Sequence, residues 1–331
     1  MIRLRLPQPL APRRLPFFLA LEEWAADSLS PADEYFFSWQ PAGPTIICGR
    51  NQSMPLEVDL PRCRELGIDV VRRRSGGGAV VSDGNNVMLS YLSGRGTGSV
   101  SEIFARWSAI LADALRHMGL PAEATGRNDI CIRGRKVSGG AFYAKPRMAI
   151  AHSTMLLRLP SPELVSALTP SRAKLETKGV RSVQARISSL HDEGIDLAPE
   201  EFADRLAAII CDSDSDRTLT PAQVLEVEKI EKEYYDPRFL RADERPGALH
   251  RLRTPRTGEI AAEYGLTPDG RISSVRFLGD FMPSGDLDRL CAALRGLTPA
   301  EIPSKAPQLD PGKYFEGLDA ETLRELFSQE P

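Results

Sequence analysis

Hydrophobic residues recur at helical spacing in several long stretches of the chain. A 3.6-residue period over 101–118 predicts an amphipathic helix, and its apolar stripe is expected to belong to the core. The stripe consists of Ile103, Phe104, Trp107, Ile110, Leu111 and Leu115. The same criterion predicts helices over 16–30, 60–66, 221–234 and most of 161–210.

Shorter runs of β-branched and aromatic residues predict strands. Residues 35–39 and 45–50 are expected to pair around a turn at Pro41–Pro44. A strand over 68–71 leads into a glycine-rich loop, and an alternating apolar stretch follows that loop. Residues 126–142 indicate a strand, a turn at Gly134, and then a second strand or the start of a helix after Lys136.

One further strand begins at Met148 and carries polar residues on both faces. Side chains alternate across a strand, so His152 and Thr154 are expected on one face and Ser153 and Met155 on the other. A lone histidine in a strand is more often structural than catalytic, and both interpretations stay open here.

The glycine-rich loop is the most informative stretch of the sequence. Arg72-Arg73-Arg74-Ser75 runs into Gly76-Gly77-Gly78. Glycines let the backbone approach a ligand closely, and arginines supply fixed donors for carboxylate or phosphate. This residue pattern matches neither the P-loop nor the dinucleotide-binding fingerprint. The structural alternative is a β-hairpin with a mobile glycine turn and a solvated basic face.

A second glycine-rich stretch surrounds Lys136, which lies between Gly134 and the pair Gly139-Gly140. A lysine tip placed there could meet a ligand held by the nearby backbone. Such a lysine is usually part of a surface turn, and Asn128-Asp129 at a strand start is usually a cap or turn device. These residues remain candidates until a wider pattern connects them.

Composition excludes several classes of protein. The 331 residues carry 42 Lys and Arg against 45 Asp and Glu, a net charge of −3, so no basic footprint predicts nucleic-acid binding. Glu22 and Glu23 interrupt the N-terminal apolar run, which is too short for a membrane span or signal peptide. The 5 cysteines lack CxxC spacing, so we expect a cytoplasmic protein with free thiols.

Two domains are predicted, over residues 1–245 and 246–331. A Pro/Arg/Gly-rich stretch over 237–257 is interpreted as the linker. The smaller unit beyond it is expected to hold strands near 259–264 and 272–278, followed by helices over 286–295 and 319–327.

In combination these stretches resemble the lipoate–protein ligase family. The motifs that carry the resemblance are the glycine loop, Asn128-Asp129 followed by Gly134-Arg135-Lys136-Val137-Ser138-Gly139, the strand with His152-Ser153-Thr154, and Lys174–Val183. Gly258-Glu259 and Gly279-Asp280-Phe281 look like the accessory domain of the two-domain bacterial form. The resemblance covers nearly the whole chain. It implies a mixed-sheet α/β fold akin to biotin ligases, followed by a small α/β C-terminal domain.

The resemblance also implies an activity in two half-reactions. Lipoate and ATP give lipoyl-adenylate and pyrophosphate, and a lysine of an acceptor protein then takes the lipoyl group as an amide. ATP and Mg²⁺ are the implied cofactors. The implied acceptors are apo lipoyl domains of 2-oxo-acid dehydrogenases and the glycine-cleavage H protein, with no nucleic-acid or membrane partner, and the chain is expected to be a monomer.

Specific residues receive roles from this resemblance. Lys136 would bridge the lipoate carboxyl oxygen and the α-phosphate, and Asp129 would orient Lys136, bind Mg²⁺ or receive the incoming ammonium. Residues expected to bind lipoate or its adenylate are Arg73, Ser75, Gly76, Gly77, Gly78, Val80, Ser82, Asn128, Ser138, Gly139, Gly140, Ala141, His152 and Thr154.

The sequence departs from the family pattern at three positions. Ser82 stands where the family often has histidine, which puts the contact of that residue with the adenylate or lipoyl chain in doubt. Gly140 and Ser153 stand where serine and glycine are usual, and we expect them to alter the shape of the pocket.

Competing functions stay open beside the ligase. A lipoyl- or octanoyltransferase of the same superfamily needs a cysteine thiolate near the lysine, for which Cys131 is a poorly placed candidate. An amidotransferase that cannot make its own adenylate and a non-catalytic lipoyl-binding protein are further alternatives. A biotin ligase is a weaker one, because its glycine loop reads differently. The acceptor, and the choice of lipoate or octanoate, are not determined by the sequence.

Overall fold

The computed structural model shows a mixed α/β protein whose chain forms two compact units. Unit 1 comprises Met1–Ile47, Val58–Arg73 and Val80–Leu240, and unit 2 comprises Cys48–Glu57, Arg74–Ala79 and Arg241–Pro331. The structure describes residues 1–9, 12–96, 99–125, 128–169, 186–213, 215–244, 246–247, 249–254, 258–283, 285–315 and 318–328. The predicted motif Lys174–Val183 therefore lies outside the described residues.

Unit 1 is built on an eight-stranded sheet with the strand order β11-β1-β2-β6-β10-β9-β8-β7. Strand β1 pairs in parallel with β2 and β11, and the other strand pairs of this sheet are antiparallel. The predicted mixed sheet is therefore confirmed. The strands are β1 (Ile2–Arg5), β2 (Glu34–Trp39), β6 (Asn86–Gly94), β7 (Ala122–Thr125), β8 (Asp129–Ile132), β9 (Arg135–Ala144), β10 (Met148–Leu156) and β11 (Arg217–Thr218).

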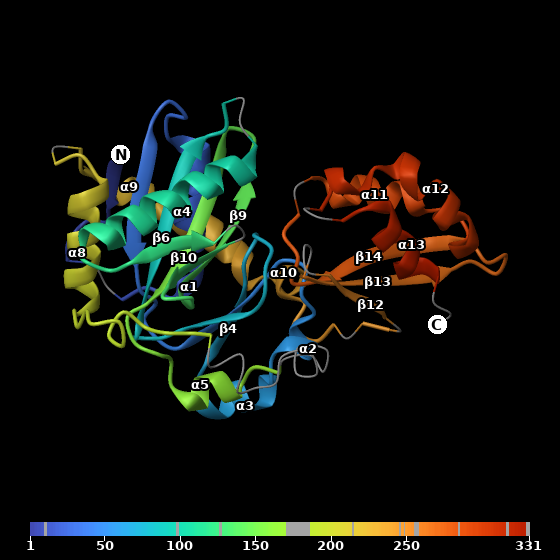
Figure 1. Ribbon diagram of the computed structural model, residues 1–331, viewed down its shortest axis with the longest axis horizontal. Helices are drawn as coiled ribbons and strands as arrows, with labels where there is room; N and C mark the ends of the chain where they lie inside the picture. The colour runs from blue at the N-terminus through green and yellow to red at the C-terminus, as the bar shows by residue number, and fades with distance from the viewer. Residues whose placement is uncertain are drawn as a thin grey trace. The chain divides into compact units, whose positions relative to one another are not determined.

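Helices pack on both faces of this sheet (Figure 1). Helix α1 (Leu15–Ser28) packs on β6 and β10 and against α9 (Pro221–Glu231). Helix α4 (Val100–His117) contacts β8, β9 and β10 from the other side and packs on α8 (Pro199–Ile210). The helices predicted over 16–30, 101–118 and 221–234 are confirmed, and the last turn of the third is the 3-10 segment η1 (Lys232–Tyr235).

A local signal fixes the start of α4. The Ser99 side chain accepts a hydrogen bond from the Glu102 amide, and the Glu102 carboxylate accepts one from the Ser99 amide. This capping box satisfies donors that the first turn leaves free. The predicted stripe is core, since Trp107, Leu111 and Leu115 are fully buried.

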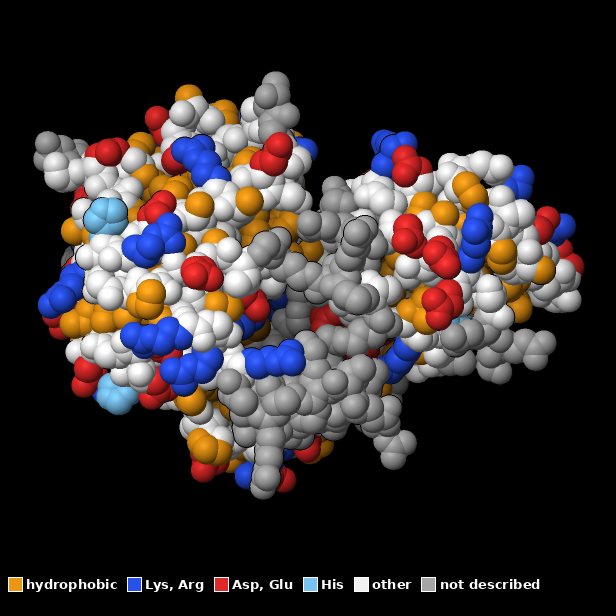
Figure 2. Space-filling view, in the orientation of Figure 1, with side chains coloured by type: hydrophobic (Ala, Val, Ile, Leu, Met, Phe, Trp, Pro, Cys, Tyr) orange, Lys and Arg blue, Asp and Glu red, His pale blue; other side chains and the backbone are white. Residues whose placement is uncertain are grey.

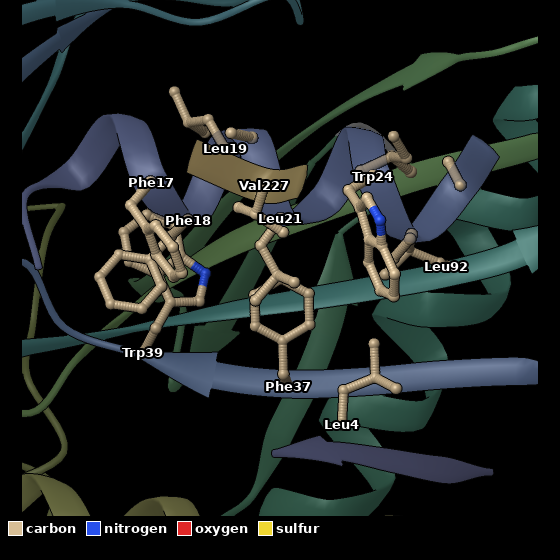
Figure 3. Close-up of a cluster of buried hydrophobic side chains, with 14 of the residues drawn as sticks. Leu4, Phe17, Phe18, Leu19, Leu21, Trp24, Phe37, Trp39, Leu92 and Val227 are labelled. Carbon is tan, nitrogen blue, oxygen red and sulfur yellow. The ribbon is translucent and has the colours of Figure 1, made fainter. Parts of the chain in front are cut away.

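The core between α1 and the sheet is strongly aromatic. Figure 3 shows Phe17, Phe18, Leu21 and Trp24 on α1 beside Phe37 and Trp39 of β2. The rings of Phe18 and Trp39 stack with centroids 4.7 Å apart. Burying such rings supplies a large hydrophobic stabilisation, and it fixes α1 on this face of the sheet.

A second, three-stranded sheet has the order β4-β3-β5. Its strands are β4 (Asp69–Arg72), β3 (Thr45–Cys48) and β5 (Val80–Ser82). The predicted pairing of 35–39 with 45–50 is therefore wrong, because β2 lies in the large sheet and β3 in this one. The glycine loop joins two strands that flank β3, so it is not the turn of a β-hairpin.

The remaining elements of unit 1 are short. Helix α3 (Leu60–Leu66) is confirmed, with Asp59 as its N-cap and Gly67 at φ 65 as its C-cap. Within 161–210 only α5 (Pro162–Ser166) and α8 are helical among the described residues, so the prediction of mostly helix is wrong for 186–198. Helix α10 (Pro237–Leu240) begins inside the predicted linker, where the Asp236 carboxylate accepts from the Arg238 amide at 2.8 Å.

Unit 2 contains an antiparallel sheet with the order β12-β13-β14. The predicted strands are confirmed as β13 (Gly258–Leu266) and β14 (Ile272–Gly279), and the predicted helices as α11 (Leu287–Leu294) and α13 (Ala320–Ser328). Strand β12 (His250–Thr254) and helix α12 (Ile302–Leu309) are additions. Helix α12 contains Pro307, which removes a backbone donor and argues against a helix in the sequence. The other elements are α2 (Met54–Glu57), η2 (Pro299–Glu301) and η3 (Pro311–Lys313).

Charges of both signs are interspersed over the face drawn in Figure 2, as expected from the small net charge. No helix in the described part of the chain is both long enough and apolar enough to span a bilayer.

Candidate functional site

Lys136 and Asp129 form an ion pair at the β8–β9 hairpin of unit 1. The Lys136 Nζ lies 2.6 Å from the Asp129 Oδ1, and about one third of each side chain is exposed (35% and 32%). Arg133 and Gly134 form the turn with φ values of 50° and 77°, the pair of positive angles that type I′ turns require. The predicted turn thus places the two charged residues side by side.

Gly139 provides the space that the tip of Lys136 occupies. In the strand register Gly139 lies opposite Asp129. A Cβ built on Gly139 would lie 2.6 Å from the Lys136 Nζ and 2.7 Å from its Cε. These separations are far below ordinary contact. Any larger residue at position 139 would therefore push the ammonium away from its present place.

Asn128 anchors the start of β8. Its Nδ2 donates to the Gly140 carbonyl at 3.0 Å, and the Gly140 amide donates to the Asn128 carbonyl at 2.8 Å. The neighbouring Asp129 is thereby fixed relative to β9. The structure gives Asn128 this structural contact, while its predicted contact with a ligand stays a prediction.

His152 lies in a buried polar network on the α1 face of the sheet. Its Nδ1 is 3.0 Å from the Glu22 Oε2. Ser90 donates to the other Glu22 oxygen at 2.6 Å, and Trp39 donates to Ser90 at 2.9 Å. A buried carboxylate needs such partners. The sequence missed this role of Glu22, although an acidic residue within an apolar helical run was a usable signal.

Thr154 and Ala141 belong to the same face as His152. The register pairs Thr154 with Gly139 and His152 with Ala141. The Thr154 hydroxyl donates to the Met88 sulfur at 3.4 Å. The predicted alternation along β10 is therefore confirmed, and this face carries Lys136, Gly139 and Thr154 together.

Gly140 and Ser153 lie on the opposite face, toward α4. The two residues are direct cross-strand partners. Ser153 accepts a hydrogen bond from the Trp107 indole at 3.1 Å, and a Cβ on Gly140 would lie 2.7 Å from the Phe104 ring. Strand alternation puts Ser138 on this face as well. The two departures from the family pattern thus contact the α4 core and not the side of Lys136.

Val80 and Ser82 lie in strand β5 of the small sheet of unit 1, and Arg73 directly follows strand β4 of that sheet. The Arg73 guanidinium donates to the Ile47 carbonyl at 3.0 Å, and Val80 pairs with Ile47. Ser82 is fully buried and donates to the Asn86 side chain at 2.9 Å. The Ser82 hydroxyl is thus hydrogen-bonded within the protein.

Ser75, Gly76, Gly77 and Gly78 belong to unit 2. The Gly77 amide donates to the Phe281 carbonyl at 3.1 Å, and Gly77 has a φ of 87°. A Cβ on Gly76 would lie 2.5 Å from the same carbonyl oxygen. The loop therefore requires glycine at these two positions because it lies against the backbone of residue 281.

The C-terminal motif Gly279-Asp280-Phe281 supports this contact. The Asp280 carboxylate accepts from the Glu259 amide at 2.6 Å. The Gly279 amide donates to the Asn51 carbonyl at 2.9 Å. A Cβ on Gly279 would lie 2.0 Å from the Glu259 carbonyl oxygen. The motif is thus a tight backbone junction that holds segments 48–57 and 74–79 on unit 2.

Asp129 is also the residue proposed to bind Mg²⁺. Its Oδ1 is buried, and the Lys136 ammonium lies next to it. Among the described residues no three His, Cys, Asp or Glu side chains form a group suited to a metal ion. Mg²⁺ commonly binds one or two carboxylates together with substrate phosphates and water. Asp129 could supply the one carboxylate of a site in which phosphates and water provide the other Mg²⁺ ligands. A site built from protein ligands alone does not fit the described residues.

Cys131 lies opposite Lys136 in the register of β8 and β9. Burial raises the pKa of its thiol, and the neighbouring Asp129 charge raises that pKa further. A nucleophilic cysteine needs the opposite shift, toward the thiolate. The surroundings of Cys131 therefore do not favour the thiolate that a thioester mechanism at this cysteine would need.

Comparison with known proteins gives consistent similarities. The model of the lipoyl protein ligase A/B catalytic domain matches residues 16–210. The chain is 31% identical to lipoate–protein ligase LplJ of Bacillus subtilis over 287 residues, which cover 82% of this chain and 83% of that protein. It is 30% identical to lipoate–protein ligase 1 of Staphylococcus aureus over 316 residues, covering 94% and 95%.

Solved structures share the fold at lower identity. The P. falciparum LipL1 structure in complex with lipoate superposes with a TM-score of 0.74 at 20% identity, covering 95% of this chain and 98% of that one. A bi-partite lipoate protein ligase of Thermoplasma acidophilum, described with its E2 lipoyl domain, gives a TM-score of 0.64 at 22% identity, covering 74% and 98%.

Proposed function

Because this chain belongs to the lipoyl protein ligase A/B family, we propose that it activates lipoate with ATP and transfers the lipoyl group to a lysine of an acceptor protein. The observation that carries the proposal is the position of the Lys136 ammonium. It lies 2.6 Å from the Asp129 carboxylate, in space that is free because residue 139 is glycine and has no Cβ. The setting is suited to a fixed positive charge beside two reacting anions.

In the first half-reaction a lipoate carboxylate oxygen attacks the α-phosphorus of ATP. The bond from that phosphorus to the bridging oxygen breaks, and pyrophosphate leaves. Both reactants are anions, so a fixed cation lowers their repulsion and stabilises the charge on the α-phosphate. We assign this role to Lys136, whose position Asp129 fixes. When bound, Mg²⁺ would neutralise phosphate charge, and Asp129 is the residue that would hold it.

In the second half-reaction the acceptor lysine amine attacks the lipoyl carbonyl carbon. The amide bond forms, AMP leaves with the electron pair, and the amine loses a proton. Lys136 acts in both steps as a charge clamp and forms no covalent bond. An alternative role for Asp129 would be to receive the incoming ammonium in this step.

The remaining assignments are part of the same proposal. Amides around Gly77 and Gly78, with Arg73 and Ser75, would bind the carboxyl end of lipoate and the adenylate. Gly139, Ala141, His152 and Thr154 would shape the pocket on the face of the sheet that carries Lys136. Val80, Ser82 and Asn128 would support it, as would Ser138 and Gly140 from the face toward α4. The proposed acceptors are apo lipoyl domains of 2-oxo-acid dehydrogenases and the glycine-cleavage H protein, met by a monomer in the cytoplasm.

The test is ATP-dependent transfer of lipoate to a purified apo lipoyl domain, read as a mass gain with pyrophosphate release recorded in parallel. Removing the charge clamp in Lys136→Ala should lower the adenylation rate by about 10²–10³-fold. An unchanged rate in that variant would remove Lys136 from the mechanism. If lipoate and ATP give no pyrophosphate, transfer from preformed lipoyl-adenylate or from a lipoylated donor protein would identify a transferase. Lipoate binding without either reaction would identify a binding protein.

A further inference from the structure

We infer that Glu193 is a positioning residue for Lys136, an inference that rests on the proposed role of that lysine. Glu193 lies in the segment 186–195, which consists largely of turns. Its carboxylate is fully buried. No motif in the sequence marks it, and it forms no part of the glycine loop or of the Lys136–Asp129 pair.

Three donors converge on this carboxylate. Arg133 and Arg135 each donate at 2.6 Å, one to each carboxylate oxygen. The Ser188 hydroxyl donates to Oε1 at 2.7 Å. Charge-assisted bonds of this length are among the stronger interactions available to a side chain. Glu193 therefore ties the β8–β9 turn, on which both arginines lie, to the segment that contains Ser188.

Residues 186–188 of this segment form backbone hydrogen bonds with Lys136. The Lys136 amide donates to the Arg186 carbonyl at 2.7 Å, and the Ser188 amide donates to the Lys136 carbonyl at 2.8 Å. Ile187 forms an isolated parallel bridge with Lys136. The backbone of Lys136 is thus fixed by residues 186–188, and its ammonium is fixed by Asp129. We call this set of contacts around Lys136 the frame. Glu193 stabilises the frame because it binds Ser188 and both arginines that flank Gly134.

Charge and exposure indicate that the fold survives loss of the carboxylate charge. Arg133 and Arg135 remain 62% and 44% exposed, so water can solvate both guanidiniums in a Glu193→Gln protein. The new amide would present its NH₂ group to one guanidinium, where two donors repel. We therefore expect the frame to open at one arginine while unit 1 stays folded.

The experiment combines kinetics with hydrogen exchange in Glu193→Gln. A misplacement of about 1 Å can cost as much as 10²-fold in rate, so we expect the turnover number for pyrophosphate release to fall about tenfold or more, with KM for ATP and lipoate changed less. Hydrogen exchange of the Lys136 and Ser188 amides should accelerate. Both amides form the hydrogen bonds that join Lys136 to residues 186–188, and these bonds should open more often when Glu193 no longer holds Ser188 and the arginines.

A matched control is Glu23→Gln. Glu23 is likewise buried, and it accepts from Tyr234 and from Lys145, but it lies on α1. This variant should lose stability while keeping the turnover number and the exchange rates at Lys136 and Ser188. A second measurement is the cycle of Arg135→Gln with Glu193→Gln, whose effects on turnover should not add if both act through one contact.

The outcomes separate the inference from the proposed function. Unchanged exchange at Lys136 and Ser188 in folded Glu193→Gln would overturn the frame. Faster exchange with an unchanged turnover number would overturn its role in catalysis. A wild-type chain that releases no pyrophosphate would contradict the proposed ligase, and exchange would still decide whether Glu193 holds the lysine.

Discussion

Replacing Gly139 by alanine separates the proposed chemistry from the stability of the fold. The new Cβ would lie 2.6 Å from the Lys136 Nζ, and apolar contacts are comfortable only near 3.5–4.0 Å. The ammonium must therefore retreat by about 1 Å, away from its position beside Asp129. A displacement of this size can cost up to about 10²-fold in rate, and we expect adenylation to fall by about 10- to 100-fold.

The stability of the Gly139→Ala protein should be equal to or slightly higher than that of the wild type. The atoms in the way are the far end of a flexible lysine, which can swing aside, and Gly139 does not have a positive φ. At such positions Gly→Ala stabilises a protein by about 0.4–1 kcal/mol, because the unfolded chain loses freedom. The Tm of Gly139→Ala should thus equal or slightly exceed that of the wild type.

The assay is pyrophosphate release at saturating ATP and lipoate, with a thermal melt of the same preparation. Gly84→Ala is the matched control, since nothing lies within 4 Å of a Cβ built there and its φ is not positive. That variant should keep full activity. A Gly139→Ala protein that adenylates lipoate at the wild-type rate would refute the assignment of Lys136 as the charge clamp.

Three further predictions follow from contacts elsewhere in the chain. Gly76→Ala places a Cβ 2.5 Å from the Phe281 carbonyl oxygen. It should destabilise unit 2 by about 1–3 kcal/mol and accelerate exchange of the Gly77 amide, and unchanged exchange would contradict the loop contact. Gly140→Ser should cost about 1–3 kcal/mol by overpacking against Phe104. In a urea titration, the double variant Gly140→Ser with Ser153→Gly should lose less free energy of unfolding than the two single variants lose together. The reason is that the Ser153 oxygen is one of the atoms that a side chain at position 140 would clash with. Additive losses would argue against a shared site. Burial raises the pKa of the Cys131 thiol, so its thiolate forms only at a higher pH than that of an exposed cysteine. Alkylation by iodoacetamide should therefore be slow at pH 8 (about the range in which free thiols begin to ionise) and accelerate as the pH rises, and fast labelling at pH 7 would revive the thioester alternative.

The sequence by itself determined the elements whose signals are local. The β8–β9 turn follows from Arg133-Gly134, and the start of α4 follows from the Ser99–Glu102 box. The neighbourhood of Lys136, Asp129 and Gly139 follows as well, because a hairpin brings together residues close in the chain. Such contacts depend on a few neighbouring side chains, which the sequence displays directly.

Only the tertiary structure decided the contacts between distant segments. Strand β3 pairs in the small sheet and not with β2, the glycine loop lies on unit 2, and Glu22 meets His152 although 130 positions separate them in the chain. Glu193 joins Arg133 across 60 positions. The pattern around a single residue does not specify its distant partner, because that choice depends on how whole faces pack and on which buried charge must be satisfied.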